Sequence, residues 1–481
     1  MKRVFSHRLT ALVTGLLLRL FFLFELPSSA GDTALYETLS QNWVKHGIYG
    51  LRVDGVLTPV DIRMPGYPGY LAVVHAFSGL SGEAARFWVL LGQAFLDLAT
   101  CVLVAGLAAR CSGRGQDPAK VSLAALWLAA LCPFTANYAA VPLTETFTLF
   151  WTALALVILV PMVNPEQAAE GILKWARFPR HAELLKSAFL AGLCVGSATL
   201  FRPESPLLLV SCLPVVLWVL FRRGQYTRAC EAAGLAAAGC LLVLLPWTTR
   251  NAVTLHEFQP LAPRYATLPG EMVPRGFMNW ENTWLYRFRE VFLVSWKLND
   301  DVIRLEDIPD RAFDSPEERQ HVAAILDQYN EDSNLTAAQD AQFEQIARAR
   351  TARSPLRTYL WIPLQRVITL WFTPRVEQLP VSGSLFPLSE TWDTDRLDLC
   401  VTVGLFFVNL LYVALALLGS LRLWRFAPEA RAALALLALF AVVRTLFLTT
   451  VETPEPRYVL ACFPALLALA AHGLVSSRLR A

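Results

Sequence analysis

The sequence has few charged residues for its length. Only 17% of its 481 residues are Asp, Glu, Lys or Arg, whereas an average soluble domain has roughly 25%. Apolar and aromatic residues make up 55% of the chain. This composition excludes a cytosolic enzyme, a disordered chain and a nucleic-acid-binding protein with a dominant basic face.

Paired cysteines are also lacking. The nine cysteines form no Cys-x-x-Cys motif, and none lies between Trp247 and Leu399. Most stand in apolar runs, where a free cysteine behaves as a small hydrophobic residue. The spacing therefore gives no support to a disulfide framework or to a zinc site.

The charge deficit is uneven along the chain. The 150 residues from Trp247 to Arg396 hold 37 charged residues, of which 16 are basic and 21 acidic, so the segment has a net charge of −5. We therefore predict three parts: an N-terminal transmembrane catalytic module (1–246) with a first outer loop (27–83), a large helical outer segment (247–396), and C-terminal transmembrane helices (397–481). Two capping motifs, at 315–318 and 336–339, predict helices to about Tyr329 and Arg353 in the outer segment.

The apolar runs predict an all-α polytopic membrane protein. A helix needs roughly 17 to 25 mainly apolar residues to cross the hydrocarbon core. About ten runs are candidates, the shortest of which, 187–201, is expected to begin a few residues earlier. The predicted spans are 9–26, 84–109, 120–136, 143–163, 187–201, 205–221, 229–246, 397–421, 428–449 and 456–475.

Loop charge decides how two further apolar stretches, 67–80 and 355–372, are interpreted. If neither crosses the membrane, 18 Lys and Arg residues lie on the side of the N-terminus, and six lie in the short loops on the other side. Short cytoplasmic loops collect Lys and Arg. We therefore predict that both stretches are interfacial or re-entrant helices on the outer face.

The N-terminal apolar run has two interpretations. Ser28-Ser29-Ala30 resembles the cleavage site of a signal peptide. However, a usual signal peptide has an apolar core of about 7 to 15 residues, whereas this run is longer and contains Arg19. We expect an uncleaved membrane anchor.

Asp32 opens a short helix in the first outer loop. Leu35, Leu39 and Trp43 recur every four residues and predict an apolar stripe on a helix that lies on the membrane. Asp32 stands where it could cap this helix. It is also a candidate catalytic carboxylate, and the two roles are compatible.

Two more acidic residues and an arginine stand near outer helix ends. Asp61 and Arg63 precede the Pro- and Gly-containing stretch Met64 to Pro68, which is a rigid turn by default. Asp61 is a second candidate acid. Glu145 lies at the outer mouth of a span, where an ionised side chain is costly unless it is paired or hydrated.

Further arginines are predicted at the same level. Arg202 and Glu204 flank Pro203 in a tight outer turn, Arg250 follows a span, and Arg457 precedes the last one. Each arginine taken alone fits an interfacial anchor. Together they suit a lipid phosphate, because guanidinium groups bind phosphate oxygens in pairs.

This combination predicts sugar transfer from a polyprenyl phosphate to a hydroxyl. The phosphate leaving group needs positive charge, which Arg202, Arg250 or Arg457 would supply. The acceptor hydroxyl needs a base, and Asp32 is the candidate.

Polar residues in the middle of the spans are few: Arg19, Asp97 and Arg444. We expect Arg19 and Asp97 to form a structural pair. A proton-coupled transport path is the functional alternative.

At these residues the sequence resembles the GT-C glycosyltransferases, in particular the bacterial relatives of protein O-mannosyltransferases and of the lipid A aminoarabinose transferase. No single motif is specific for this family. The order of the motifs along the chain and their common position on the outer side make the resemblance specific. The matching stretches are 31–36, 63–68, 133–138, 143–145, 199–204, 246–251 and 456–458.

The resemblance implies an enzyme of the bacterial inner membrane with its active site on the periplasmic face and a polyprenyl-phosphate-linked sugar as donor. By position, Asp32 would be the acidic residue of the first outer loop that is proposed as base, and Glu145 the acidic residue of the second. Contacts to the donor phosphate or sugar would come from the arginines Arg63, Arg202, Arg250 and Arg457, with Glu145 and Glu204 as further candidates.

The chain departs from the family's protein O-mannosyltransferases in one motif. Those enzymes carry an Asp-Glu pair in the first loop, whereas Thr33 follows Asp32 here. Protein mannosylation is therefore disfavoured, and a lipid, glycan or protein acceptor stays open. Only six residues follow Val475, so a soluble part that recognises the acceptor is expected within 247–396.

Cofactors and alternative functions stay open. No cofactor is indicated. A divalent metal stays open, although His46, His75 and His256 have no metal-binding spacing. The expected partners are the lipid-linked donor, the acceptor and the bilayer, without nucleic acid. The alternatives are a multi-span transporter, which places its polar groups near the midplane, and an envelope polysaccharide polymerase or ligase.

Overall fold

The computed structural model describes residues 2–79, 82–113, 115–164, 181–268, 270–383, 385–386 and 388–475. The chain forms two compact units, each described by itself. The first comprises Met1–Ala266, Pro374–Val443 and Leu460–Ala481, and the second comprises Thr267–Thr373 and Arg444–Val459. This division differs from the three predicted parts. The reason is that the C-terminal helix α19 (Phe463–Leu474) packs against α4 (Gly82–Arg110), α5 (Pro118–Ala130) and α7 (Glu145–Val163) of the N-terminal part. Both groups of membrane helices therefore share one unit.

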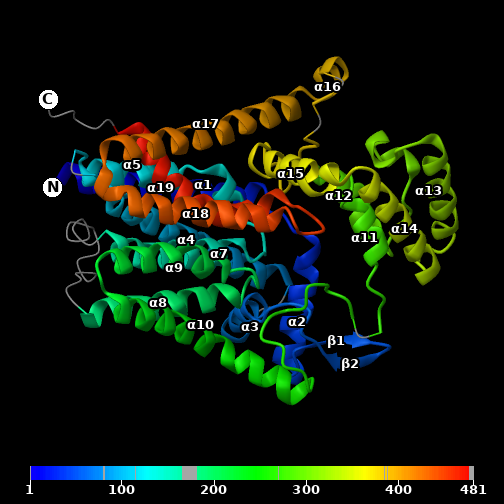
Figure 1. Ribbon diagram of the computed structural model, residues 1–481, viewed down its shortest axis with the longest axis horizontal. Coiled ribbons are helices and arrows are strands. Elements are labelled where there is room, and N and C mark those ends of the chain that lie inside the picture. Colours follow the sequence, from blue (N-terminus) through cyan, green and yellow to red (C-terminus); the bar gives the residue numbers. More distant parts are fainter. Residues whose placement is uncertain are drawn as a thin grey trace. The chain divides into compact units, whose positions relative to one another are not determined.

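The predicted spans are helical (Figure 1). The shortest predicted run, 187–201, was expected to begin a few residues earlier, and its helix α8 does begin at His181. Pro133 divides the predicted span 120–136 into two helices, because a proline opens a helix more readily than it continues one. The corresponding helices are α1 (Lys2–Glu25), α4 (Gly82–Arg110), α5 (Pro118–Ala130), α6 (Pro133–Tyr138), α7 (Glu145–Val163), α8 (His181–Thr199), α9 (Leu207–Arg222), α10 (Tyr226–Thr254), α17 (Arg396–Phe426), α18 (Arg431–Leu448) and α19 (Phe463–Leu474).

Among the described residues, seven helices are long and apolar enough to cross a membrane. They include α1, α4, α7, α10 and α17, whereas α5 and α9 are shorter apolar helices. The chain is thus a polytopic helical membrane protein. Six of the 18 basic residues used for the predicted orientation lie outside the described residues: Arg114, Lys174, Arg177, Arg180, Arg478 and Arg480.

Arg19 and Asp97 form the predicted structural pair inside the first unit. The Arg19 Nη2 atom lies 2.6 Å from Asp97 Oδ2, and both side chains are fully buried. Arg19 also donates to the carbonyl oxygens of Gly15 and Ala130. One buried ion pair therefore joins α1, α4 and the end of α5, and it satisfies a charge that would be costly alone.

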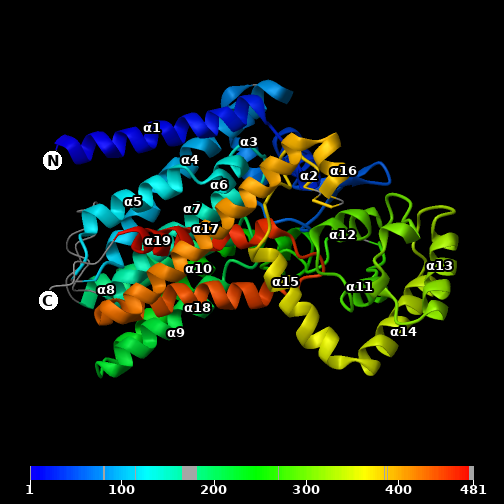
Figure 2. The same cartoon turned by 90° about the horizontal axis from the view of Figure 1, so that it is seen from above.

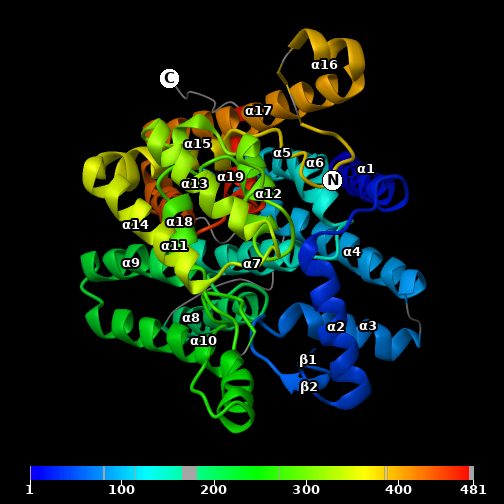
Figure 3. The same cartoon turned by 90° about the vertical axis from the view of Figure 1, so that its right-hand side faces the viewer.

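The first outer loop contains a feature that we did not predict. It consists of α2 (Gly31–His46), β1 (Gly50–Val53), β2 (Val56–Pro59) and α3 (Gly66–Ser78), and Figure 3 shows the two strands beside α2. The strands form an antiparallel hairpin in which Val53 pairs with Val56. Asp54 and Gly55 have φ angles of 50° and 81°. An Asp-Gly pair suits this two-residue turn, because it tolerates positive φ at both central positions.

The buried face of α2 is shifted from the predicted stripe. Leu39 is buried as expected, but Trp43 is 38% exposed. The buried face instead includes Thr33, Tyr36 and Ser40. The tertiary contacts of this helix therefore involve a polar and aromatic face, which an apolar periodicity does not reveal.

The second unit has its own core. It contains α11 (Arg275–Glu281), α12 (Phe288–Leu293), α13 (Pro316–Tyr329), α14 (Ala337–Arg353) and α15 (Ile362–Trp371) (Figure 2). Trp280, Trp284 and Phe343 lie at its centre. Both predicted capping helices are confirmed: Ser315 Oγ accepts from the Glu318 amide at 3.2 Å, and Thr336 Oγ1 accepts from the Gln339 amide at 3.3 Å.

The predicted interfacial stretch 355–372 is helical and amphipathic. A π-helical turn, Arg357–Trp361, leads into α15. Leu356, Leu360 and Leu364 are exposed at intervals of four residues, whereas Ile362 and Arg366 are buried. This pattern suits a helix that lies on a membrane surface, which stays a prediction. The first such stretch, 67–80, corresponds to α3, and its last residue, Leu80, lies outside the described residues.

The buried Glu281 predicts a pH dependence for the second unit. Burial raises the pKa of Glu281 from 4.5 to about 8, although a hydrogen bond from Ser295 Oγ at 2.5 Å and the nearby Arg366 favour the charged form. Between pH 4.5 and 8 the Glu281 carboxyl therefore keeps its proton in the folded state and loses it in the unfolded state. The contribution of Glu281 to the free energy of unfolding should therefore be greatest below pH 4.5 and should fall as the pH rises to about 8.

Thermal unfolding of the full chain between pH 4 and 9 measures this loss. Glu281→Gln keeps the shape of the side chain and removes the titration, so its melting temperature should fall less over this range. An equal fall in the variant and the wild type would contradict the assignment to Glu281.

Candidate active site

The first turn of α2 holds the central carboxylate. The helix is capped by Ala30, whose N–H donates to Thr33 Oγ1 at 3.1 Å. The capping role considered for Asp32 is therefore wrong, since Asp32 lies inside the first turn. Its Oδ1 instead accepts from Arg63 Nη2 at 2.8 Å. The positive end of the helix dipole also favours a carboxylate here.

The loop that carries Arg63 is fixed from two sides. Tyr49 Oη donates to the Arg63 carbonyl oxygen at 2.9 Å. The Gly66 amide donates to the Leu200 carbonyl oxygen at 2.7 Å. A Cβ at Gly66 would lie 2.5 Å from this oxygen, so only glycine allows the close approach. The loop therefore rests on the turn that carries Arg202.

We predict that Gly66→Ala displaces this loop. The clash is with backbone, which cannot rotate away, so the Arg63 guanidinium should move from Asp32 and activity should fall at least about tenfold, the cost of a small displacement in a preorganised site. Gly69→Ala is the control, because its Cβ would lie 3.6 Å from the Trp43 ring, an ordinary contact. Turnover and thermal unfolding of both variants measure the effect, and equal turnover would contradict it.

Glu145 and Arg202 form a second, more buried pair. Arg202 Nη2 bonds Glu145 Oε1, and Arg202 Nε donates to Thr144 Oγ1 at 3.1 Å. Glu204 is a more distant partner, with 3.7 Å between its Oε1 and Arg202 Nη1. The side chain of Glu145 is 2% exposed and that of Arg202 is 13% exposed. This pair joins the start of α7 to the turn after α8.

Tyr36 lies within electrostatic range of both pairs. Burial raises the pKa of its hydroxyl far above the ordinary value, and Asp32 raises it further. Arg63 and Arg202 act in the opposite direction, and Glu145 again raises it. Backbone contacts bring the two pairs near each other, because the Gly66 amide bonds the Leu200 carbonyl oxygen and Thr33 Oγ1 bonds the Pro142 carbonyl oxygen. The predicted site residues Asp32, Arg63, Glu145, Arg202 and Glu204 therefore come together.

Arg250 and Asp61 lie at the other side of Tyr49. Arg250 donates to the carbonyl oxygens of Tyr49 at 2.7 Å and Val60 at 2.9 Å, and its guanidinium lies 5.1 Å from the Trp247 ring centroid. These contacts fasten the hairpin to the outer end of α10. Partial burial raises the pKa of Asp61, and Arg250 opposes this effect.

Arg457 belongs to the second unit. Its Nε donates to Glu455 Oε2 at 2.6 Å, and the guanidinium lies 5.5 Å from the Tyr458 ring centroid. Arg444 of the same unit donates to the Tyr458 carbonyl oxygen at 3.2 Å. The structure therefore brings Arg457 to a local carboxylate, and its role in donor binding stays a prediction.

Exposure separates the two pairs of the first unit. The side chains of Arg63 and Asp32 are 27% and 24% exposed, whereas Glu145 is enclosed. A small molecule can therefore reach Asp32 and Arg63. The pair offers one proton acceptor beside one fixed cation, which is a suitable arrangement for deprotonating a hydroxyl next to an anionic leaving group.

No group of three or more His, Cys, Asp or Glu side chains is placed to hold a metal ion among the described residues. His46 and His256 are exposed, and His75 lines a separate pocket.

Two aromatic residues of the site were not singled out from the sequence. Tyr36 closes the quoted 31–36 motif, but its burial against Tyr67, with ring centroids 5.2 Å apart, depends on α3. Tyr49 precedes a hairpin that we did not predict. The Asp54-Gly55 turn signal would have located the hairpin and hence Tyr49 at its base.

Comparisons with known proteins find similarity only among solved structures. No protein-family model and no curated protein matches the chain. The chain is similar to an Archaeoglobus fulgidus oligosaccharyltransferase tethered with an acceptor peptide (TM-score 0.48, 12% identity, 96% of this chain and 49% of that chain). It is also similar to ArnT from Cupriavidus metallidurans bound to undecaprenyl phosphate (TM-score 0.41, 15% identity, 98% of this chain and 77% of that chain).

The chain spans about half the length of the oligosaccharyltransferase. At these TM-scores and identities, the likeness does not extend to residue roles, substrates or cofactors.

Proposed function

We propose that the chain is a membrane glycosyltransferase that moves a sugar from a polyprenyl-phosphate-linked donor to an acceptor hydroxyl. The observation that carries this proposal is the Asp32–Arg63 pair, which is accessible while the neighbouring Glu145–Arg202 pair is enclosed. An accessible carboxylate beside a fixed arginine, at the level where membrane helices end, suits a reaction on a lipid phosphate.

Asp32 acts as the base in this proposal. Its carboxylate takes the proton of the acceptor hydroxyl while the hydroxyl oxygen attacks the anomeric carbon of the donor. The bond between that carbon and the phosphate oxygen breaks. The leaving phosphate is already anionic, so it needs positive charge rather than a proton.

Arg63 supplies this charge to the donor phosphate. Its guanidinium lies beside Asp32 and can share its donors between the carboxylate and phosphate oxygens. Arg202 is the more enclosed arginine and adds positive charge near the site. It also holds the turn whose Leu200 carbonyl oxygen accepts from the Gly66 amide of the Arg63 loop. Glu145 and Glu204 hold Arg202.

Arg250 has a positioning role in this proposal. Two of its hydrogen bonds go to backbone carbonyl oxygens of the first loop, so it fixes the loop that carries Arg63. Asp61 is the second acid near this arginine. A donor-binding role for Arg457 rests on the sequence alone, and the proposed acceptor is a lipid, a glycan or a protein. We propose the periplasmic face of a bacterial inner membrane for this site.

Binding of the lipid tests the phosphate assignment. Full-length protein in detergent is titrated with polyprenyl phosphate and, separately, with the neutral polyprenol, and binding is measured by native mass spectrometry. We expect the phosphate to bind at least about tenfold more tightly, and Arg63→Ala to remove most of the difference, since one charge-assisted contact contributes about 1.5 to 3 kcal/mol.

Arg52→Ala is the matched control, because Arg52 is an exposed arginine on the hairpin of the same loop. Equal binding of the two lipids, or equal losses in the two variants, would contradict the assignment of Arg63 to the phosphate.

A further inference from the structure

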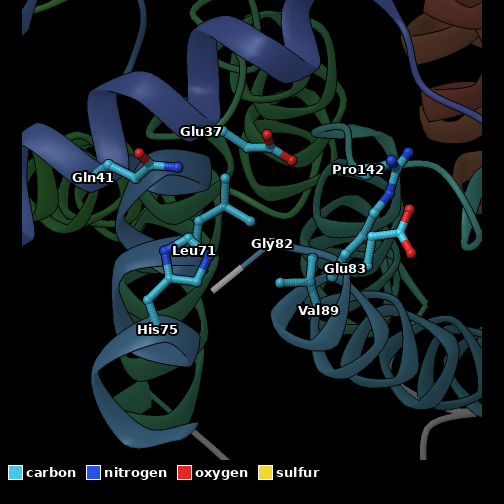
Figure 4. Close-up of a pocket in the computed structure, with 9 residues that line it drawn as sticks. Glu37, Gln41, Leu71, His75, Gly82, Glu83, Val89 and Pro142 are labelled. Carbon is cyan, nitrogen blue, oxygen red and sulfur yellow. The ribbon is translucent and has the colours of Figure 1, made fainter. Parts of the chain in front are cut away.

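A pocket of about 180 Å³ is lined on α2 by Glu37 and Gln41, which helical periodicity places on the face of this helix opposite Asp32. Thr33 Oγ1 donates to the Pro142 carbonyl oxygen at 3.2 Å, and Pro142 forms part of the pocket wall. Figure 4 shows Glu37 on α2, with His75 across the pocket on α3 and Glu83 on α4. The complete lining is Glu37, Gln41, Leu71, His75, Gly82, Glu83, Arg86, Val89 and Pro142.

The two carboxylates in this pocket take no part in the ion pairs of the described chain. Among the described residues, Glu37 and Glu83 form no ion pair. Arg86 donates through Nη2 to the Ser28 carbonyl oxygen at 2.7 Å, but its Nε is buried without a hydrogen-bond partner in the described chain. Buried donors are normally satisfied, so a ligand oxygen at Arg86 is the simplest explanation.

The pocket lies at the end of a membrane span. α4 begins at Gly82, so Glu83 and Arg86 belong to its first turns, where lipid headgroups are found. Two aromatic side chains on the helices that line the pocket are exposed: Phe77 on α3 is 89% exposed, and Trp88 on α4 is 50% exposed. Exposed aromatic residues at this level suit contact with lipid.

The charges of the lining indicate a zwitterion. One guanidinium suits a phosphate, and two carboxylates suit an ammonium group. The lining contains no Phe, Tyr or Trp, whereas quaternary ammonium groups are bound by cages of these side chains. Partial burial lowers the pKa of His75, so it is a neutral hydrogen-bonding group at neutral pH. A primary amine therefore fits better than choline.

We propose that this pocket binds the phosphoethanolamine headgroup of a membrane phospholipid, with Arg86 on the phosphate and Glu37 and Glu83 on the ammonium. Its volume equals that of about six water molecules at roughly 30 Å³ each, which suits a small headgroup. The inference goes beyond sugar transfer and does not rest on it, because it concerns the opposite face of α2.

Lipid selectivity tests the inference in the absence of any sugar donor. Full-length protein in detergent is titrated with dihexanoyl phosphatidylethanolamine, phosphatidylcholine and phosphatidylglycerol, and with soluble O-phosphoethanolamine, by native mass spectrometry. We expect the ethanolamine lipid to bind at least about tenfold more tightly than each of the other three. Phosphatidylcholine has no ammonium N–H to donate to the carboxylates, phosphatidylglycerol has no ammonium group, and O-phosphoethanolamine has no lipid chains.

Variants locate the binding. Glu37→Gln and Glu83→Gln should each weaken binding of the ethanolamine lipid about tenfold, whereas Glu25→Gln, at an exposed carboxylate outside the pocket, should not. Thermal unfolding identifies any variant that misfolds. Glu83 is exposed, so its replacement should leave the fold intact and still test the pocket if Glu37→Gln misfolds. Equal affinity for the three lipids, or unchanged binding in Glu83→Gln, would overturn the inference. Equally tight binding of O-phosphoethanolamine would overturn the assignment to a lipid.

Discussion

Asp32→Asn should lower the turnover of a polyprenyl-phosphate-linked sugar by about 10²- to 10⁴-fold, the usual contribution of a general base. Asparagine has nearly the same shape and still accepts a hydrogen bond from Arg63, so the loop should stay in place. What it loses is the ability to take the proton of the acceptor hydroxyl. Binding of polyprenyl phosphate should therefore change much less than turnover.

Initial rates of polyprenyl phosphate release at saturating donor measure this effect. Asp54→Asn is the control: it makes the same chemical change at an exposed carboxylate in the hairpin turn, where φ is 50° and asparagine is also tolerated. Turnover of Asp32→Asn within threefold of the control would show that Asp32 is not the base.

Glu145→Ala should cost the protein about 3 kcal/mol of unfolding free energy and most of its activity. Glu145 is enclosed, and its removal leaves the buried Arg202 guanidinium without its main partner. Breaking such a pair on one side typically costs 3 to 5 kcal/mol. The Leu200 to Arg202 turn supports Gly66, so the Arg63 loop should loosen as well.

Thermal unfolding in detergent and turnover should be measured together for this pair. Glu204→Gln is the matched control, because Glu204 lies 3.7 Å from Arg202 and is the weaker partner; it should change both quantities little. The double variant Glu145→Gln, Arg202→Gln removes both charges of the close pair and leaves only Glu204, the weaker partner of Arg202, so it should recover much of the stability without recovering activity. A double variant that is as unstable as Glu145→Ala would contradict this account of the pair.

Much of the membrane architecture follows from the sequence. Spans are long apolar runs, so their approximate bounds follow from where these runs lie in the sequence. The Arg19–Asp97 pair was expected because two opposite charges inside apolar helices have few other partners. The helices after Ser315 and Thr336 were expected because capping side chains contact amides only three residues away.

The site itself was only partly predictable. Asp32, Arg63, Glu145 and Arg202 were singled out by type and position, but no sequence pattern shows that Asp32 bonds Arg63 while Glu145 bonds Arg202. Those pairings depend on the approach of Gly66 to Leu200, which are far apart in the chain. The capping role for Asp32 failed because Thr33 supplies the hydroxyl that bonds the Ala30 amide.

Release of polyprenyl phosphate tests the central claim most directly. Purified full-length protein is incubated with a panel of polyprenyl-phosphate-linked sugars and a membrane extract as the source of acceptor, and both free polyprenyl phosphate and acceptor-linked sugar are quantified. We predict that wild type converts at least one donor, with equal amounts of the two products, and that Asp32→Asn does not. No conversion of any donor by a folded protein that binds polyprenyl phosphate, or equal conversion by Asp32→Asn, would contradict the account.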